Sequence, residues 1–449
     1  MKFGDTGGTF APDEARAGKL MGVLVVALVF SVMNGTMFNV ALPVIAERFS
    51  LAPSQVSWVM TSYMVVYAVG SVVYGKLADN YPLKSLVTFG MLVFGLGSIL
   101  GMAADAYATV VLGRVFQAAG AAVMPAASMI VPVRYFPAER RGKALGTTAV
   151  GLALGGALGP VVAGSIAGLG SWRWLFVFSL ASLATLPFFR KYLGDDQGQP
   201  GRIDWLGGGL LAAATAAYLL SITQGRWLIF AGGCVLLALF LIRIRNAAAP
   251  FIPPALFANR KYAVGLLLAF LTAALNFSAT FMAPQFLTSL NHLSPGGVGT
   301  ILFPAAIASA LLGRLGGKLA DRRGNEGLVW LGSCLLLLGY GLLSVFVGEA
   351  AYWIALFLIA SQIGQTFMQI AMSNTVSRTL SADQVGVGMG MLAMLNFIAG
   401  ALAMSAIGKL LDRATGEAGG AQAYGSIFIG MCLTVLVVAG LYRLRFPKG

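Results

Sequence analysis

The sequence predicts an all-α polytopic membrane protein, and three features of its composition support that prediction. Apolar residues make up 58% of the 449 positions and charged residues only 10%, whereas a soluble domain carries roughly 25% charged residues. The mean hydropathy is +0.83. The chain also contains 58 glycines, which helices in lipid use to approach one another closely. A soluble globule is excluded because charge is too scarce to cover its surface, and disorder is excluded because it requires low hydrophobicity.

Fourteen stretches are apolar enough to cross a bilayer, since a helical span needs about 20 such residues. They lie at 20–40, 57–77, 85–104, 108–131, 143–166, 173–190, 204–223, 227–244, 262–285, 298–318, 327–347, 351–376, 385–408 and 424–443. The connections between them are too short for a soluble domain, so any function must reside in the helical bundle.

Positive charge sets the predicted orientation, because Lys and Arg concentrate in cytoplasmic loops. With residues 1–19 placed in the cytoplasm, most of the 30 Lys and Arg residues fall on that side. The external exceptions are Arg48, Arg173, Arg226, Lys409 and Arg413. We therefore expect a multi-pass protein of a bacterial plasma (inner) membrane, with both termini cytoplasmic and the first span retained rather than cleaved. The net charge of +14 then reflects topology and not a nucleic-acid partner.

Residues for metal or cofactor chemistry are scarce, and we expect neither. The single histidine, His292, leaves no imidazole cluster for haem or zinc. Every acid lies in a loop or at the end of a predicted span, whereas an enzyme would need reactive groups clustered at one depth. The alternative of a membrane enzyme or receptor is therefore disfavoured. The expected partners are a small-molecule substrate and membrane lipid, with the chain acting as a monomer and proton coupling left open.

Two segments repeat at nearly the same spacing, which indicates a duplicated six-span unit. The sequence Gly75–Asp79 recurs as Gly317–Asp321. A second set recurs further on, with Arg134, Glu139, Gly142 and Gly146 matched by Arg378, Asp383, Gly386 and Gly390. The predicted organisation is a cytoplasmic segment 1–19, a six-span half 20–192, a linker with two inserted spans 193–246, and a second six-span half 247–449. Parallel repeats of this kind are typical of transporters whose halves rock around a central site.

The repeated segment predicts a conformational latch on the cytoplasmic side. Each of Asp79 and Asp321 can face the positive N-terminus of a helix from the other half, and neighbouring cations can add charge-assisted hydrogen bonds. The alternative is that the basic loops only fix topology. The predicted latch consists of Gly75, Asp79, Lys84, Gly142, Gly317, Asp321, Arg322 and Gly386.

Polar residues inside the predicted spans are the candidate substrate-binding groups. Gln362, Gln365, Gln369 and Ser373 recur at helical spacing on one face of the twelfth span, so they should point into the bundle. Neutral amides suit a polar, uncharged or zwitterionic ligand, and the alternative of interhelical hydrogen bonding is weighed equally. Further candidates are Asn34, Asn39, Tyr63, Asn276, Gln285 and Asn396.

Four segments in order resemble the major facilitator superfamily. They are Gly75–Lys84 between spans 2 and 3, Gly113–Gly120 in span 4, Gly151–Pro160 in span 5 and Asn39–Pro43 at the end of span 1. With fourteen spans and the central insert, the chain is most similar to the drug–proton antiporters, the tetracycline and multidrug exporters, which the resemblance links to antibiotic resistance. The implied fold has two six-helix halves plus two inserted central helices.

The resemblance implies two further site roles. Arg114, with Gln117 one turn on, matches an arginine implicated in proton coupling; a buried unpaired guanidinium is costly, and the alternative is a structural arginine. Gly151, Gly155, Gly159 and Pro160 match a gating helix whose bare face packs between the halves. The alternative for these residues is simple close packing of helices.

The expected function is export of hydrophobic or amphipathic small molecules by alternating access, coupled to protons. Tetracycline exporters of the family carry acids inside three spans, where this chain has Gly35, Gly156 and Gly400. The alternative is therefore an uncoupled facilitator or a lipid-type flippase, since proton antiport needs a group that titrates.

Overall fold

The computed structural model describes residues 14–136, 138–167, 171–194, 204–247, 250–380, 385–412 and 416–446. Within these ranges some helical side chains are not described, among them those at 79–80, 138–143, 317–318, 320–324 and 385–386. The first group of helices is α1 (Glu14–Phe49), α2 (Pro53–Val56), α3 (Trp58–Asn80), α4 (Leu83–Met102), α5 (Tyr107–Ala121), α6 (Val123–Tyr135), α7 (Ala138–Ala167), α8 (Trp174–Leu180), the 3₁₀ turn η1 (Ala181–Thr185) and α9 (Leu186–Tyr192). The second group is α10 (Trp205–Gln224), α11 (Trp227–Asn246), α12 (Ala255–Ala258), α13 (Arg260–Ser289), α14 (Pro295–Phe346), α15 (Ala351–Arg378), α16 (Val385–Leu411) and α17 (Gly416–Arg445).

In the described part of the chain, twelve helical segments are long and apolar enough to cross a membrane. The chain is therefore an all-helical, multi-pass membrane protein. The predicted fifth span falls on α7, whose apolar part is only Val150–Ile166. The predicted sixth span falls on α8, η1 and α9, where the 3₁₀ turn at Ala181–Thr185 interrupts the α-helix. The count of fourteen spans thus stays a prediction.

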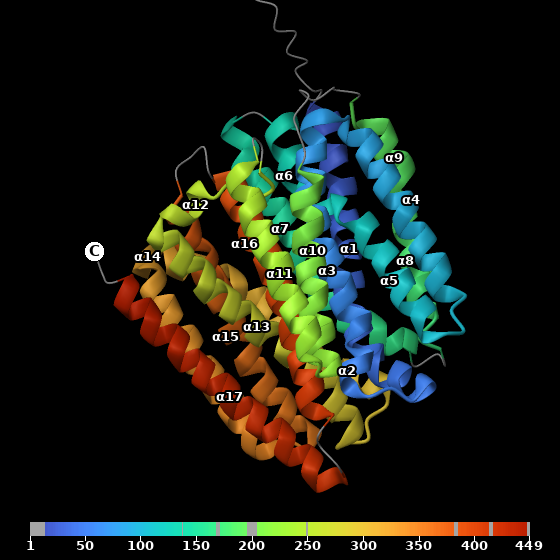
Figure 1. The fold of residues 1–449 in the computed structure, drawn as a ribbon, viewed down its shortest axis with the longest axis vertical. Coiled ribbons are helices and arrows are strands. Elements are labelled where there is room, and N and C mark those ends of the chain that lie inside the picture. Colours follow the sequence, from blue (N-terminus) through green and yellow to red (C-terminus); the bar gives the residue numbers. More distant parts are fainter. Residues whose placement is uncertain are drawn as a thin grey trace, which may run out of the picture.

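The two predicted halves repeat the same helix packing. In the first half α1 packs on α7 and α4 on α5, and in the second half α13 packs on α16 and α14 on α15. Across the boundary, α3 packs on α16 and α7 on α14. Figure 1 shows the first half in blue to green, with α9 at the right, beside the second half in yellow to red, and α10 and α11 in light green between them. The exchange of equivalent helices across the boundary is the arrangement that a parallel duplication predicts.

Glycines set the close approach of α4 and α5. A Cβ built at Gly97 would lie 2.5 Å from the backbone nitrogen of Gln117, and one at Gly120 would lie 2.2 Å from the carbonyl oxygen of Gly90. No real side chain tolerates such contacts, so only glycine allows these backbones to meet. The helix that carries Arg114 is consequently pressed onto its neighbour along most of its length.

The glycine face of α7 packs against α1 within the first half, while α7 also packs on α14 of the second half, so the gating role of this helix stays a prediction. The nearest neighbours of Gly151, Gly155 and Gly159 are residues of α1, including Val25, Val29 and Thr36 in turn. These glycines have no side chains, so the backbones of α7 and α1 can approach each other closely along this face.

Contact between α7 and the second half involves Pro160 and Gly164, which follow the glycine face in the sequence. A Cβ at Gly299 of α14 would lie 3.0 Å from the carbonyl oxygen of Pro160 and 3.1 Å from the Cα of Gly164. Of the predicted gating residues, Pro160 alone has a close contact of this kind with the other half.

The inserted helices α10 and α11 form a pair that joins the bundle through α10, which packs on both α3 and α16. Asp204 caps α10 by accepting a hydrogen bond from the Gly207 N–H at 3.0 Å. The same carboxylate accepts from Arg243 Nε at 3.0 Å and from the Phe251 N–H at 3.2 Å. Lys76 also lies over the Phe251 ring, 5.5 Å from its centroid. The insert is therefore tied to the start of the second half and to α3.

Candidate functional site

A cavity of about 410 Å³ lies among α13, α15 and α16 of the second half. Its polar lining comprises five carboxamide side chains and one threonine: Asn276, Gln362, Gln365, Gln369, Asn396 and Thr366. Its apolar lining comprises Ala273, Phe277, Ile370, Ala393 and Phe397. A cavity of this size is within the range that holds small-molecule ligands.

Helical spacing explains why the amides meet at this cavity. Gln362, Gln365 and Gln369 stand at i, i+3 and i+7 on α15, so they share one face. That face is turned to α13 and α16, from which Asn276 and Asn396 reach the same cavity. Five of the ten candidate substrate-binding residues are thus brought together, although they come from three helices, and Ser373 is not among the lining residues.

Two amide oxygens at the cavity are buried without a partner. Gln365 donates from Nε2 to the carbonyl oxygen of Thr272 at 2.6 Å, which fixes its side chain. Its Oε1 accepts nothing, and neither does Oδ1 of Asn396. Leaving a buried acceptor unsatisfied costs about 1–3 kcal/mol, so each oxygen has a hydrogen-bonding capacity that the described residues do not meet.

Aromatic rings connect the cavity to the first half. Phe277 and Phe397 have ring centroids 6.2 Å apart, and Tyr67 of α3 meets Phe397 edge-on at 4.9 Å. Tyr67 in turn stacks on Tyr63 at 5.6 Å. The position of Phe277 depends on Gly400, because a Cβ there would lie 2.4 Å from the Phe277 ring. The cavity is thus lined by the second half and is linked to the first half through the contact of Phe397 with Tyr67.

Arg114 is fully buried in the first half and is held by neutral groups. Its Nη1 donates to Asn34 Oδ1 and to Gln117 Oε1, both at 2.8 Å. Its Nε donates to the carbonyl oxygen of Val59 at 3.2 Å. The guanidinium carbon lies 4.1 Å from the ring centroids of both Phe38 and Tyr63. Among the described residues no carboxylate forms an ion pair with this arginine.

The hydrogen bonds continue from Arg114 to other helices. Gln117 donates from Nε2 to Ser98 of α4 at 2.8 Å, and Asn34 donates from Nδ2 to Ser179 of α8 at 2.7 Å. Arg114 Nη2 is buried without a partner. A cation that links α1, α3, α4, α5 and α8 organises the first half, while one of its donors stays available.

The other candidate residues lie away from the cavity. Asn34 serves Arg114, and Tyr63 stacks beside it with its hydroxyl unpaired. Asn39 is buried with Oδ1 unpaired. Gln285 donates to the carbonyl oxygen of Phe281 in its own helix at 3.2 Å. None of these four lines the cavity described above.

The predicted latch falls largely outside the described side chains. The helix pairs that it needs are in contact, α3 with α16 and α14 with α7. The side chains outside the described residues are those of Asp79, Gly142, Gly317, Asp321, Arg322 and Gly386. Gly75 and Lys84 are described, and a Cβ at Gly75 would meet nothing within 4 Å. The latch therefore stays a prediction.

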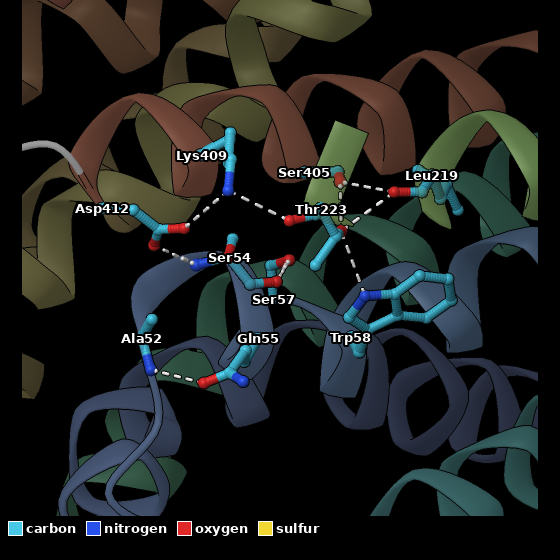
Figure 2. A network of polar contacts seen from close by, with 10 residues as sticks. All are labelled: Ala52, Ser54, Gln55, Ser57, Trp58, Leu219, Thr223, Ser405, Lys409 and Asp412. Atoms are coloured by element: carbon cyan, nitrogen blue, oxygen red, sulfur yellow. Dashed lines mark hydrogen bonds and ion pairs between the residues drawn. The ribbon is translucent and has the colours of Figure 1, made fainter. Parts of the chain in front are cut away.

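A polar network at the opposite end of the bundle was not found from the sequence (Figure 2). Asp412 Oδ1 accepts from the Ser54 N–H at 2.9 Å, and Lys409 Nζ donates to the carbonyl oxygen of Thr223 at 3.1 Å. Thr223 Oγ1 also accepts from Trp58 Nε1 and meets Ser405 Oγ, both at 3.2 Å. The only signal in the sequence was Lys409 itself, a cation on the predicted external side.

The network joins three parts of the chain that are far apart in sequence. Its groups come from α2 and α3 in the first half, from α10 in the insert and from α16 in the second half. We call these residues the outer network: Ser54, Trp58, Thr223, Ser405, Lys409 and Asp412.

Known proteins resemble this chain over most of its length. The riboflavin transporter RibZ of Clostridioides difficile is 28% identical over 315 residues, covering 68% of this chain and 69% of that protein. Multidrug resistance protein 3 of Bacillus subtilis is 28% identical over 364 residues, covering 78% of this chain and 70% of that protein. Among solved structures, a bacterial homologue of the human lysosomal transporter Spinster, in an inward-facing and unoccupied conformation, matches the fold with a TM-score of 0.71 at 15% identity, covering 96% and 97% of the two chains.

Residues 24–404 match the Major Facilitator Superfamily. This range includes the cavity, the Arg114 network and three of the six residues of the outer network. With twelve apolar helices among the described residues and relatives that are named transporters, the chain is a transporter and not an enzyme, and it belongs to the Major Facilitator Superfamily.

Proposed function

We propose that this protein exports an amphipathic small molecule across a bacterial inner membrane by alternating access. Its halves, 20–192 and 247–449, would rock around the amide-lined cavity, with fourteen spans, both termini cytoplasmic and a monomer as the working unit. The observation that carries the proposal is the convergence of Asn276, Gln365 and Asn396 from three helices on one cavity, whose residue Phe397 contacts Tyr67 of the first half.

The outer network supports a two-state mechanism. It closes one end of the boundary through a hydrogen bond between two hydroxyl groups, a bond from a backbone N–H to the Asp412 carboxylate, and a bond from the Lys409 ammonium to a carbonyl oxygen. Interhelical hydrogen bonds in membrane proteins are worth about 0.6 kcal/mol each on average. A handful of such bonds is strong enough to favour one state and weak enough to be broken in each transport cycle.

Two relatives bear on the substrate. One is named a riboflavin transporter and another a multidrug resistance protein. Both names fit transport of an organic compound with apolar and polar parts, for which a cavity with amides and phenyl rings is suited.

Two candidates remain for how transport is driven, with or without coupling to protons. Proton antiport is the expectation from the family, and it needs a titrating group. The second candidate is an uncoupled facilitator, which is favoured by the cavity lining, since none of its described residues is an acid or a base.

The proposal is tested by measuring the flux of an amphipathic small molecule across the membrane of proteoliposomes, with and without a pH gradient. Transport that the Asn396→Leu substitution abolishes, and that Ser426→Ala outside the cavity leaves unchanged, supports the site. A dependence of flux on the gradient selects antiport, and equal flux selects the facilitator. Flux that is the same with Asn396→Leu as with the parent protein rejects the cavity as the transport site.

A further inference from the structure

The cavity has a chemistry that narrows its ligand. We propose that it takes an uncharged, planar compound that carries an amide or imide edge, meaning an N–H beside a C=O. This inference rests on the proposed transport function and names its substrate class. It selects against both cations and anions of the same size.

The first step is the absence of charge from the lining. The described polar residues of the cavity are carboxamides and one threonine. A charge moved from water into such a site, with no opposite charge to meet it, carries a large desolvation penalty. Neutral ligands avoid that penalty, so the lining favours binding of neutral ligands over charged ones.

The second step concerns Arg114, a positive charge that a series of aromatic contacts connects to the cavity. Arg114 lies against Tyr63, which stacks on Tyr67, and Tyr67 touches the cavity residue Phe397. Among the described residues no carboxylate is paired with this arginine. In a medium of low dielectric an uncompensated cation acts over long distances, so its field disfavours a cationic ligand in particular.

The third step is the hydrogen-bonding capacity left open. Gln365 Oε1 and Asn396 Oδ1 are buried acceptors without donors, and they come from two different helices. A carboxamide side chain pairs in a bidentate manner with a ligand edge that presents a donor beside an acceptor, as Asn and Gln do with adenine. An imide or amide edge supplies the N–H that these oxygens lack, and its C=O can accept from the amide nitrogens of the lining.

The fourth step is shape. Phe277 and Phe397 present two rings to the cavity with an interplanar angle of 40°. Aromatic side chains favour flat ligands because offset stacking adds to the area that is buried. Gly400 is needed for this wall, since any larger residue would displace the Phe277 ring.

The experiment compares three flat probes on the purified protein in nanodiscs. Riboflavin is uncharged and has an imide edge, flavin mononucleotide is the same ring system with a phosphate, and ethidium is a planar cation. We expect riboflavin to bind, with flavin mononucleotide and ethidium each at least about tenfold weaker, as measured by quenching of probe fluorescence and by calorimetry. Asn396→Leu should weaken riboflavin at least about tenfold, while Thr434→Val, outside the cavity, should not.

A second variant keeps the inference testable if Asn396→Leu fails to fold. Gln369→Glu places a carboxylate at an exposed position of the lining, and it should raise the affinity for ethidium and lower that for riboflavin. Equal binding of riboflavin and flavin mononucleotide, or ethidium binding more tightly to the parent protein, overturns the inference, as does no binding of riboflavin. Failure of the proposed transport function gives a different result, because riboflavin would then bind at the cavity but would not cross the membrane of vesicles that contain the protein.

Discussion

The outer network closes only because residue 408 has no side chain. A Cβ built at Gly408 of α16 would lie 2.8 Å from the Cα of Ser54 and 2.9 Å from the carbonyl oxygen of Pro53. Ordinary contact begins at 3.4 Å, so Gly408→Ala must move α16 away from α2 by about 0.6 Å at this point. That displacement would stretch the hydrogen bond from Ser54 to Asp412, now 2.9 Å.

The size of the effect follows from the packing. Overpacking of this kind costs about 1–3 kcal/mol. Because the clash exists only while α2 and α16 touch, the cost falls on the closed state and not on the open one. The equilibrium should therefore move toward opening by about 5- to 150-fold, the range that corresponds to this free energy.

The assay is the reactivity of a cysteine placed behind the closure. Ser62 lies one turn beyond Trp58 on α3 and is buried. In a protein without the three native cysteines, Ser62→Cys should react with an external, membrane-impermeant maleimide about 5- to 150-fold faster when Gly408→Ala is present. The matched control is Gly430→Ala in α17, where a Cβ would meet nothing within 4 Å. Labelling that is no faster with Gly408→Ala than with Gly430→Ala would refute this reasoning.

Three further predictions concern the buried cation, the insert and the predicted latch. Arg114→Lys keeps the charge but loses the planar guanidinium, which donates from Nη1 to Asn34 and Gln117 and from Nε to the carbonyl oxygen of Val59. Since hydrogen bonds of charged groups are worth about 1.5–3 kcal/mol each, both the melting temperature and transport should fall; full transport would reduce the role of Arg114 to its charge alone. At Asp204, burial acts to raise the pKa, but the hydrogen bonds from the Gly207 and Phe251 N–H groups and from Arg243 outweigh it and hold the pKa below its ordinary value. This stabilisation should be complete above about pH 4 and should fade as the pH drops through the lowered pKa. The melting temperatures of the parent protein and of Asp204→Asn should therefore differ at pH 7 and converge in acid. A difference in melting temperature that does not change with pH contradicts this prediction. Asp79→Asn should impair transport while leaving membrane insertion intact, and unchanged transport kinetics would remove the latch.

The sequence by itself determined the class of protein and the faces of its helices. Low charge and long apolar stretches require a membrane solvent, because no other environment satisfies such a chain. Helical periodicity placed Gln362, Gln365 and Gln369 on one face of α15, and the high cost of an unpaired buried cation required that Arg114 face a partner or a cavity. These conclusions depend on local spacing and on solvation, both of which can be read along a single segment.

Only the tertiary structure decided which helix meets each face. Asn34 and Asn396 look alike in sequence, yet the first binds Arg114 and the second lines the cavity. The glycine face of α7 meets α1 and not the other half, and α10 joins the outer network through Thr223. The physical reason is that lipid tails are as apolar as a neighbouring helix, so hydrophobicity marks where a helix crosses the membrane but not which partner covers each side of it. That choice depends on close packing and hydrogen bonds between residues that are hundreds of positions apart.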